Sequence, residues 1–286
     1  MSDTFIKKRI KLSDVSGLKK RLRAGGLHTV CESALCPNIG ECFARNTATF
    51  LICGNLCTRA CAFCGVPKGI PLPLDAGEPA RLASAVKNFN LSYVVITSVT
   101  RDDLADGGAG HFAAVIAAVR RENPGIKVEV LTPDFGGDPN AARTVFASRP
   151  EVFAHNLETV PSLYPKIRAG AVYERSLALL KSAADAGLVV KSGLMLGLDE
   201  TKDETLAVMR DLLANGCAML TLGQYLAPAK ANFTVARHLR ESEFEELKNT
   251  ALSMGFTACA AGPYVRSSYR AEELLSGQQH TGRRQP

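Results

Sequence analysis

The sequence predicts an α/β protein built as an open or partial barrel, with a separate extension at each end. The chain has 286 residues and 46% of them are hydrophobic, which suffices for one large packed domain. From residue 47 onward, short apolar β-rich runs alternate with longer helical patterns, whereas both ends lack this alternation. We therefore expect a barrel over 47–261, an N-terminal extension over 1–46 and a C-terminal extension over 262–286, both wrapping the barrel mouth.

Seven runs read as strands buried on both faces, because they are β-branched and almost continuously apolar. They are Thr47–Cys53, Ser92–Val99, Lys127–Leu131, Val152–His155, Leu188–Leu196, Ala218–Leu222 and the weaker Phe256–Cys259. The helical stretches between them are Pro79–Asn88, Gly110–Arg121, Pro139–Ala147, Tyr173–Ala186, Lys202–Asn215 and Glu241–Met254. This alternation is typical of βαβ units in a parallel sheet. Six or seven units are too few for a complete eight-stranded barrel, and loops after the strands should carry the site.

Local signals support several of these boundaries. Gly187 follows a helical run, where a glycine accepts the left-handed conformation that ends many helices. Asn123-Pro124-Gly125 predicts a turn between a helix and the next strand. Glu241 begins an acidic first turn, which suits the dipole of the last long helix.

The formal net charge is +6, and basic residues are concentrated near the N-terminus. Eight lysines and arginines lie between Lys7 and Arg23, against the single acid Asp14. Two interpretations stay open: a solvated, partly flexible arm, or a docking segment for an acidic partner, in which case Lys7, Lys8, Arg9 and Lys11 contribute. Nucleic acid is unsupported, since no aromatic residues are interleaved with the charges.

No segment indicates export or a membrane. The stretch Met1–Lys11 is polar and basic and lacks the apolar core of a secretory signal. The sequence also has no run of about 18 apolar residues, which a membrane-spanning helix would need. We therefore expect a cytoplasmic protein that binds neither a membrane nor nucleic acid.

Nine cysteines are the strongest compositional signal, and seven of them lie between residues 31 and 64. In a reducing cytoplasm, such crowding indicates metal-ligand or redox chemistry rather than a disulfide framework. The other two, Cys217 and Cys259, lie in apolar runs, and Cys53 ends a strand outside any ligand spacing. We interpret these three as small buried residues. His111, at the start of a helix, is interpreted as a capping or packing residue rather than a general base.

Cys57, Cys61 and Cys64 form a C-x3-C-x2-C motif directly after the first strand. Three close thiolates can hold three irons of a four-iron cluster and leave the fourth iron open to another ligand. A cluster with an open iron can bind and reduce a substrate or cofactor. The alternatives are buried thiols or a zinc site, but zinc usually takes four ligands in two separated pairs.

Upstream, Cys31, Cys36 and Cys42 form a C-x4-C-x5-C motif with proline and glycine turns between the cysteines. This triad can form the binding site of a second cluster, and the alternative on composition alone is a set of spare thiols.

The C-x3-C-x2-C spacing, with the aromatic Phe63 directly before the last cysteine, resembles the radical S-adenosylmethionine (SAM) superfamily. The resemblance implies that the open iron chelates the amino and carboxylate groups of SAM. It implies that one electron then splits the sulfonium and releases a 5′-deoxyadenosyl radical. The partial (β/α)6 barrel of that superfamily matches the architecture predicted above.

Within that superfamily, the chain resembles the lipoyl synthase family over nearly its whole length. In that family the second serine of an Arg-Ser-Ser-Tyr motif is the fourth ligand of the auxiliary cluster, which implies this role for Ser268. An alkoxide is harder than a thiolate and more readily protonated, which suits a cluster that must come apart. The motifs are His28-Thr29-Val30-Cys31-Glu32, Cys36-Pro37-Asn38, Gly40-Glu41-Cys42, Thr47-Ala48-Thr49-Phe50, Ser98-Val99-Thr100-Arg101-Asp102-Asp103-Leu104, His155-Asn156-Leu157-Glu158-Thr159-Val160, Gly223-Gln224-Tyr225-Leu226 and Arg266-Ser267-Ser268-Tyr269.

The resemblance also implies a SAM pocket built from the ends of strands. Besides Phe63, the residues expected there are Thr97, Ser98, Asp102, Asn156, Glu158, Arg168 and Gly197. Gly197 belongs to a loose match to the superfamily's G-x-I-x-G-x-x-E pattern, running from Gly193 to Glu200 with Met195 in the isoleucine position. Each of these residues alone has a plainer interpretation, such as close packing for a glycine or solvation for a loop arginine.

The implied function is radical insertion of two sulfur atoms, at carbons 6 and 8 of an octanoyl chain. The implied substrate chain is amide-linked to a lysine of a lipoyl carrier protein, such as a dehydrogenase E2 subunit or the glycine cleavage H protein. The cofactors are two 4Fe-4S clusters and SAM, and a flavodoxin or ferredoxin is the expected electron donor. The alternatives are another radical SAM sulfur-insertion enzyme and, from a different class, a non-catalytic two-cluster electron carrier.

Overall fold

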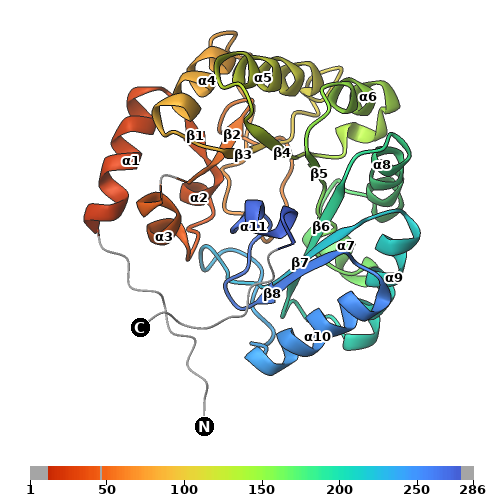
Figure 1. The fold of residues 1–286 in the computed structure, drawn as a ribbon. Coiled ribbons are helices and arrows are strands. Elements are labelled where there is room, and N and C mark those ends of the chain that lie inside the picture. The colour runs from red at the N-terminus through yellow and green to blue at the C-terminus, as the bar shows by residue number, and fades with distance from the viewer. Residues whose placement is uncertain (1–11, 46, 278–286) are drawn as a thin grey trace.

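The computed structural model describes residues 12–45 and 47–277. Within these residues, eight strands follow one another in sequence order across one sheet (Figure 1). The first pair is antiparallel, and all later neighbours are parallel. The strands are β1 (His28–Thr29), β2 (Thr49–Ile52), β3 (Tyr93–Ser98), β4 (Lys127–Leu131), β5 (Val152–Ala154), β6 (Val190–Leu196), β7 (Met219–Gln224) and β8 (Ala258–Gly262).

The long helices form a ring around the outside of the curved sheet (Figure 1). The helices are α1 (Leu12–Ala24), α2 (Val30–Ser33), α3 (Ile39–Ala44), α4 (Glu78–Asn88), α5 (Ala109–Glu122), α6 (Pro139–Ala147), α7 (Tyr164–Ile167), α8 (Tyr173–Asp185), α9 (Lys202–Ala214), α10 (Glu241–Met254) and α11 (Ala271–Leu275). Two short 3-10 turns, η1 (Phe135–Gly137) and η2 (Pro161–Leu163), lie in the loops. None of the described helices is long and apolar enough to cross a lipid bilayer.

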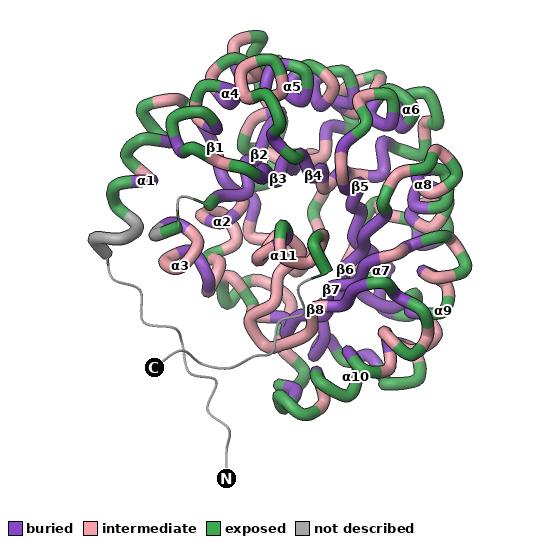
Figure 2. Tube along the Cα trace, in the orientation of Figure 1, coloured by how far each residue is buried: buried purple, intermediate pink, exposed green. Residues whose placement is uncertain are grey.

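The core lies between the strands and the inward faces of the helices, and the strands form a buried inner layer (Figure 2). Parallel pairing sets Ile52 opposite Ser98 and Thr97 opposite Leu131, so the carboxyl ends of β2, β3 and β4 meet at one edge. Local chemistry sets the helix ends: a capping box at Thr201 begins α9, and a left-handed Gly255 ends α10. The carboxyl edge of the sheet is where the candidate site lies.

The α/β partial barrel predicted from the sequence is confirmed, and all seven expected strands and six expected helices are present within a few residues of their predicted bounds. The prediction missed β1 and the short helices of the two extensions. The interpretation of the basic N-terminal segment as a solvated, partly flexible arm is wrong in part for residues 12–24: they are helical, whereas Lys20, Arg21 and Arg23 are exposed to water as expected. Residues 12–24 form α1, which lies against α3 and buries Leu18 and Leu22. Lys7, Lys8, Arg9 and Lys11 lie outside the described residues.

The two extensions meet where the sheet does not close between β1 and β8. The Asn38 amide donates a 2.7 Å hydrogen bond to the carbonyl of Tyr264. Glu41, beside Cys42, accepts hydrogen bonds from the Tyr269 hydroxyl at 2.8 Å and from the Arg270 guanidinium at 2.7 Å. Contacts more than 220 residues apart in sequence therefore fix the C-terminal extension to the N-terminal cysteine segment.

The sequence predicted that the C-terminal extension wraps the barrel mouth, but the extension does more than that. It leaves β8 at the carboxyl edge of the sheet, where the absence of a side chain at Gly223 lets the Val265 carbonyl approach closely. It ends in α11, where Ala271 and Leu275 pack with Tyr93 and Val95 of β3 near the opposite edge. Figure 1 shows α11 in the middle of the ring. The segment thus runs from one end of the barrel to the other and brings Ser268 into its interior.

Candidate active site

The loop after β2 holds the C-x3-C-x2-C cysteines in a fixed shape. The backbone amide of Cys57 donates to the Pro67 carbonyl at 2.9 Å, and the amide of Gly69 donates back to the Cys57 carbonyl at 3.1 Å. Farther along the loop, the Ala62 amide donates to the Ile167 carbonyl at 2.9 Å. The three thiols are half-buried, and none of the nine cysteines, all within the described chain, forms a disulfide.

Burial and hydrogen bonding set the state of the loop thiols. Burial raises the pKa of the Cys61 thiol and raises that of Cys64 to about 11, so bound metal would be needed to hold them as thiolates. The Cys64 sulfur already accepts the Val66 amide at 3.4 Å. In residues 12–45 and 47–277, no three His, Cys, Asp or Glu side chains gather around one point as a lone ion requires. A four-iron cluster binds each thiolate on a different iron and has no such requirement.

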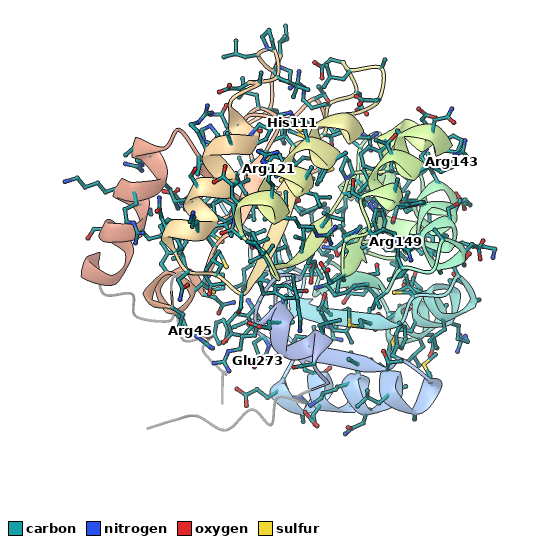
Figure 3. All side chains as sticks on the ribbon, turned by 45° about the horizontal axis from the view of Figure 1, so that its top comes forward. Arg45, His111, Arg121, Arg143, Arg149 and Glu273 are labelled. Atoms are coloured by element: carbon teal, nitrogen blue, oxygen red, sulfur yellow. The ribbon has the colours of Figure 1, made fainter. Side chains whose placement is uncertain are left out.

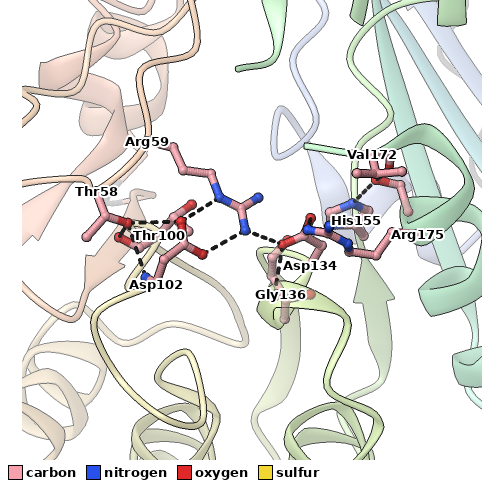
Figure 4. A network of polar contacts seen from close by, with 11 residues as sticks. Thr58, Arg59, Thr100, Asp102, Asp134, Gly136, His155, Val172 and Arg175 are labelled. Carbon is pink, nitrogen blue, oxygen red and sulfur yellow. Dashed lines mark hydrogen bonds and ion pairs between the residues drawn. The ribbon is translucent and has the colours of Figure 1, made fainter. Parts of the chain in front are cut away.

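Arg59, inside the cysteine motif, ties the loop to the ends of β3 and β4 (Figure 4). Its guanidinium donates two 2.7 Å hydrogen bonds to Asp102 and one of 2.7 Å to the fully buried Asp134, which Arg175 also contacts at 3.2 Å. Burial alone would lower the pKa of Arg59 and raise that of Asp134, but their hydrogen bonds outweigh burial and shift both pKa values toward the charged forms. The sequence predicted Asp102 but missed Arg59 and Asp134, since nothing in the sequence pairs them.

A cavity of about 260 Å³, here called the upper cavity, opens at the carboxyl ends of the strands. Of the residues predicted for the first cluster and the SAM pocket, four line it together, namely Phe63, Cys64, Asn156 and Glu158. Its walls are otherwise largely apolar, with Leu194, Met195, Tyr225 and Leu226 among them.

Unpartnered polar atoms lie at the same end of the barrel. The Ser98 hydroxyl and the Arg168 Nε are buried without a hydrogen-bond partner, as are the hydroxyls of Thr132 and Thr159. Buried polar groups are almost always hydrogen-bonded, so an orphaned group at a strand end marks a place where a polar ligand would complete the bonding. The predicted residues Ser98 and Arg168 therefore fit a bound polar cofactor such as SAM.

The other three predicted SAM contacts have partners inside the protein. Thr97 donates its hydroxyl to the Leu131 carbonyl at 2.8 Å, and Asp102 is engaged by Arg59. Gly197 has a positive φ of 92°, and a side chain there would overlap Gln224 and the Arg237 carbonyl. Gly197 thus shapes the loop after β6, and these three residues do not line the upper cavity.

Opposite charges line the inner wall of the upper cavity. Removal of Glu158 from water raises its pKa, and Arg168, Asn156 and Arg266 oppose that shift. Asn156 donates to Glu158 at 3.1 Å, and the Asn156 carbonyl accepts from Arg168 at 3.0 Å. The arrangement holds a carboxylate at hydrogen-bond distance from an amide, beside two guanidinium groups.

The second cysteine set meets the same cavity. Cys31, Cys36 and Ser268 line it, although Ser268 lies more than 230 residues after the cysteines. Thr49 Oγ1 donates a 2.7 Å hydrogen bond to Ser268 Oγ, and Thr49 also hydrogen-bonds Cys31. Burial raises the pKa of Cys31 to about 11. Three of the four residues expected to hold an auxiliary cluster therefore line one wall, with hydrogen bonds linking two of them through Thr49.

A buried ion pair supports the segment that carries Ser268. Lys191 of β6 donates to Glu129 of β4 and, at 3.0 Å, to the carbonyl of Ser267. The Tyr93 hydroxyl donates to Glu129 at 2.6 Å, and both charged side chains are inaccessible to water. Sequence reasoning missed this pair, yet a signal was present: Lys191 is the lone charge in a run predicted to be buried on both faces, and Glu129 lies between two valines of another such run.

The remaining predicted residues have structural roles. Cys53, Cys217 and Cys259 are buried in strands or strand ends, which confirms their interpretation as small core residues. His111 is buried and lies 2.6 Å from the Glu78 carboxylate, which agrees with a packing role.

The comparisons with known proteins agree with this geometry. Residues 51–212 match the radical SAM superfamily, and the chain belongs to it. Solved structures share the fold: methylornithine synthase (TM-score 0.54, 16% identity, 93% of this chain and 72% of that one) and the hydrogenase maturase HydG from Carboxydothermus hydrogenoformans (TM-score 0.53, 12% identity, 92% and 78%).

Closer relatives narrow the assignment. The chain is 53% identical over 272 residues to the lipoyl synthase of Caldicellulosiruptor saccharolyticus, covering 94% of this chain and 95% of that relative. It is 52% identical to the lipoyl synthase of Photorhabdus laumondii, covering 93% and 84%. The chain therefore belongs to the lipoyl synthase family, and it is an enzyme of the radical SAM class. Membership of this class implies SAM and a 4Fe-4S cluster as cofactors.

Proposed function

We propose that the protein inserts two sulfur atoms, at carbons 6 and 8, into an octanoyl chain that is amide-linked to a lysine of a lipoyl carrier protein. The observation that carries this proposal is that one cavity is lined by cysteines of both motifs, Cys31, Cys36 and Cys64, and by Ser268. Family membership at more than 50% identity over nearly the full chain supports it.

The residues divide into two binding sets. Cys57, Cys61 and Cys64 hold three irons of the first 4Fe-4S cluster. Cys31, Cys36, Cys42 and Ser268 hold the second cluster. When bound, the first cluster and SAM supply a 5′-deoxyadenosyl radical, and the second cluster supplies the sulfur and is consumed.

The polar lining of the upper cavity binds the charged parts of SAM. Ser98 at the end of β3 and Arg168 after α7 have unpartnered buried atoms, and the cavity is lined by Glu158 and by Asn156, whose carbonyl accepts from Arg168. Phe63 contacts the cofactor from the cysteine loop. Thr97, Asp102 and Gly197 contribute by shaping the strand ends, in keeping with their partners inside the protein.

The apolar lining of the upper cavity holds the substrate. An aliphatic C–H bond has no acidic proton or leaving group, so acid–base catalysis cannot act on it and a cofactor must provide the reactivity. The protein's task is to exclude water and to orient one hydrogen toward the radical. Leu194, Met195 and Leu226 give an aliphatic chain a surface without quenching groups.

The partners follow from the family. The substrates are octanoylated dehydrogenase E2 subunits and the glycine cleavage H protein, and the reaction belongs to lipoate biosynthesis in the cytoplasm. A flavodoxin or ferredoxin supplies the electron. The basic N-terminal residues Lys7, Lys8, Arg9 and Lys11 are the proposed contact for an acidic carrier surface.

The test is mass analysis of an octanoylated carrier peptide after anaerobic incubation with reconstituted protein, SAM and a reductant. We expect a singly and then a doubly sulfur-substituted peptide, together with 5′-deoxyadenosine. Cys217→Ser, at a buried thiol outside both sets, is the matched control and should retain both products. Formation of 5′-deoxyadenosine without sulfur gain in the peptide would contradict sulfur insertion. If no 5′-deoxyadenosine formed, the result would favour the alternative function of a two-cluster electron carrier.

A further inference from the structure

The four proposed auxiliary ligands lie between two separate cavities. Cys31 and Cys36 line the upper cavity, whereas Cys42 lines a second cavity of about 720 Å³, here called the basal cavity. Ser268 lines both, and among the described residues it is the one that the two linings share. A group held by these four side chains therefore has one side toward each cavity.

The basal cavity opens at the amino ends of the strands, opposite to the upper cavity. Ser92 and Tyr93 at the start of β3 and Lys127 at the start of β4 line it, together with α11. Arg45 and Glu273, which form a 3.6 Å ion pair at its rim, lie near each other in Figure 3. Ser92 and Ser276, on two other segments of the rim, are exposed to water.

The chemistry of the two linings differs. The upper cavity is apolar apart from its cofactor-facing groups, while the basal cavity carries both carboxylates and cationic groups, including Lys127 and Glu272. Carboxylates attract a divalent cation, and lysine and arginine attract an anion such as hydrosulfide. A polar, solvent-connected cavity suits the passage of small ions rather than the binding of an aliphatic chain.

The proposed function makes such a passage necessary. If the auxiliary cluster gives up its sulfur, iron and sulfide must return to the four ligands before the next turnover. The upper cavity, at about 260 Å³, lies just below the range of about 300–1,000 Å³ for a pocket that holds one small-molecule ligand. SAM and the octanoyl chain occupy that side, so a second route is required on the other.

We propose that the basal cavity is the route by which iron and sulfide ions, two ferric, two ferrous and four sulfide ions for each cluster, reach the auxiliary ligands. The inference rests on the proposed function, since it needs Cys31, Cys36, Cys42 and Ser268 to hold a cluster. It adds that the substrate chain reaches that site through the upper cavity, whereas iron and sulfide reach it from the opposite face of the molecule. Resupply can then proceed while the substrate chain stays in the upper cavity.

The test measures the rate of cluster formation at the auxiliary site alone. The full-length chain with Cys57→Ser, Cys61→Ser and Cys64→Ser is loaded anaerobically with equal amounts of ferrous and ferric iron and with sulfide, which together balance a 4Fe-4S cluster. Visible absorbance and bound iron are followed over time. In this background, two separate variants narrow the rim of the basal cavity: Ser92→Trp, directly before β3, and Ser276→Trp, directly after α11. A folding defect in one of them therefore does not end the test. Ser84→Trp, at an exposed position in the groove between α1 and α4, is the matched control.

We expect both rim variants to slow auxiliary loading several-fold, with the same final iron content and with Ser84→Trp unchanged. Leu35→Trp narrows the upper cavity at an exposed lining residue. If Leu35→Trp slows loading and the rim variants do not, or if no variant slows it, the proposed route is wrong. If the Cys57, Cys61 and Cys64 background takes up no cluster at all, the auxiliary ligand assignment fails, and this result differs from an unchanged loading rate.

Discussion

The buried Lys191–Glu129 pair provides a quantitative test of how the barrel interior is organised. Both side chains are inaccessible to water, and Lys191 also donates to the Ser267 carbonyl at 3.0 Å. Removing one partner of such a pair leaves an uncompensated buried charge, which costs about 3–5 kcal/mol. We therefore expect Lys191→Met to lower the thermal unfolding midpoint by on the order of 10 °C in a protein of this size.

The double variant separates charge from hydrogen bonding. Lys191→Met with Glu129→Gln removes both charges and keeps an acceptor for the Tyr93 hydroxyl, whose pKa burial and Glu129 raise above its usual value. Neutral replacement of a buried pair is often harmless, so most of the lost stability should return. A residual loss of about 1 kcal/mol is expected from the hydrogen bond to Ser267.

The assay is anaerobic thermal unfolding of the single and double variants, followed by circular dichroism, with bound iron measured on the same samples. Because Ser267 precedes Ser268, both variants should also hold less auxiliary iron than the parent protein. A double variant as unstable as Lys191→Met would refute the reasoning, since the unpaired charge would then not be the cause. A Lys191→Met variant as stable as the parent would refute it as well.

Three further predictions follow from the site. Arg59→Met removes the hydrogen bonds to Asp102 and Asp134, and a displaced cysteine loop should lower the rate of SAM cleavage by on the order of 100-fold, measured as 5′-deoxyadenosine formed per minute. Ser268→Ala should still form deoxyadenosine but yield no doubly sulfur-substituted peptide by mass spectrometry; full sulfur insertion would remove Ser268 from the ligand set. His155 is buried, and burial lowers its pKa from the ordinary 6.5 to about 4. The unfolded chain therefore binds a proton that the folded chain refuses, and stability should fall by about 3 kcal/mol as the pH drops from about 6.5 to about 4. Denaturant unfolding of His155→Gln should lack this part of the pH dependence.

The sequence predicted the parts of the structure that depend on local patterns. Buried parallel strands carry a continuous apolar signal, and the C-x3-C-x2-C motif lies on one loop, so both were accessible from the chain alone. The same reasoning misread residues 12–24, because the many basic residues obscured the helical spacing of Leu18 and Leu22. It also placed the C-terminal extension only at the mouth, since no local pattern reports that residues after Gly262 turn back through the barrel.

The candidate site was likewise predictable only in part. Resemblance grouped Cys64, Phe63, Asn156 and Glu158, and the structure brings them to one cavity wall because each follows or joins a strand end. Resemblance could not distinguish a residue that lines the cavity from one that supports it. Asp102 was expected among the cofactor contacts, but its carboxylate accepts two hydrogen bonds from Arg59. That pairing joins segments 43 residues apart and depends on the fold rather than on a motif.

The positions of the charges explain why the C-terminal segment can occupy a barrel interior at all. A backbone running through an apolar lumen would leave carbonyls and amides without partners, at a cost of several kcal/mol for each. Here Lys191 donates to the backbone carbonyl of Ser267, and the side-chain hydroxyls of the segment are also bonded: Ser267 donates to Asn156 at 3.2 Å and Ser268 accepts from Thr49. The ion pair with Glu129 is what allows a cation to remain in that interior. The charged interior is therefore part of what places Ser268, the proposed fourth ligand, inside the barrel, and substitutions that make the lumen more apolar should stabilise the barrel only if they also displace Ser268.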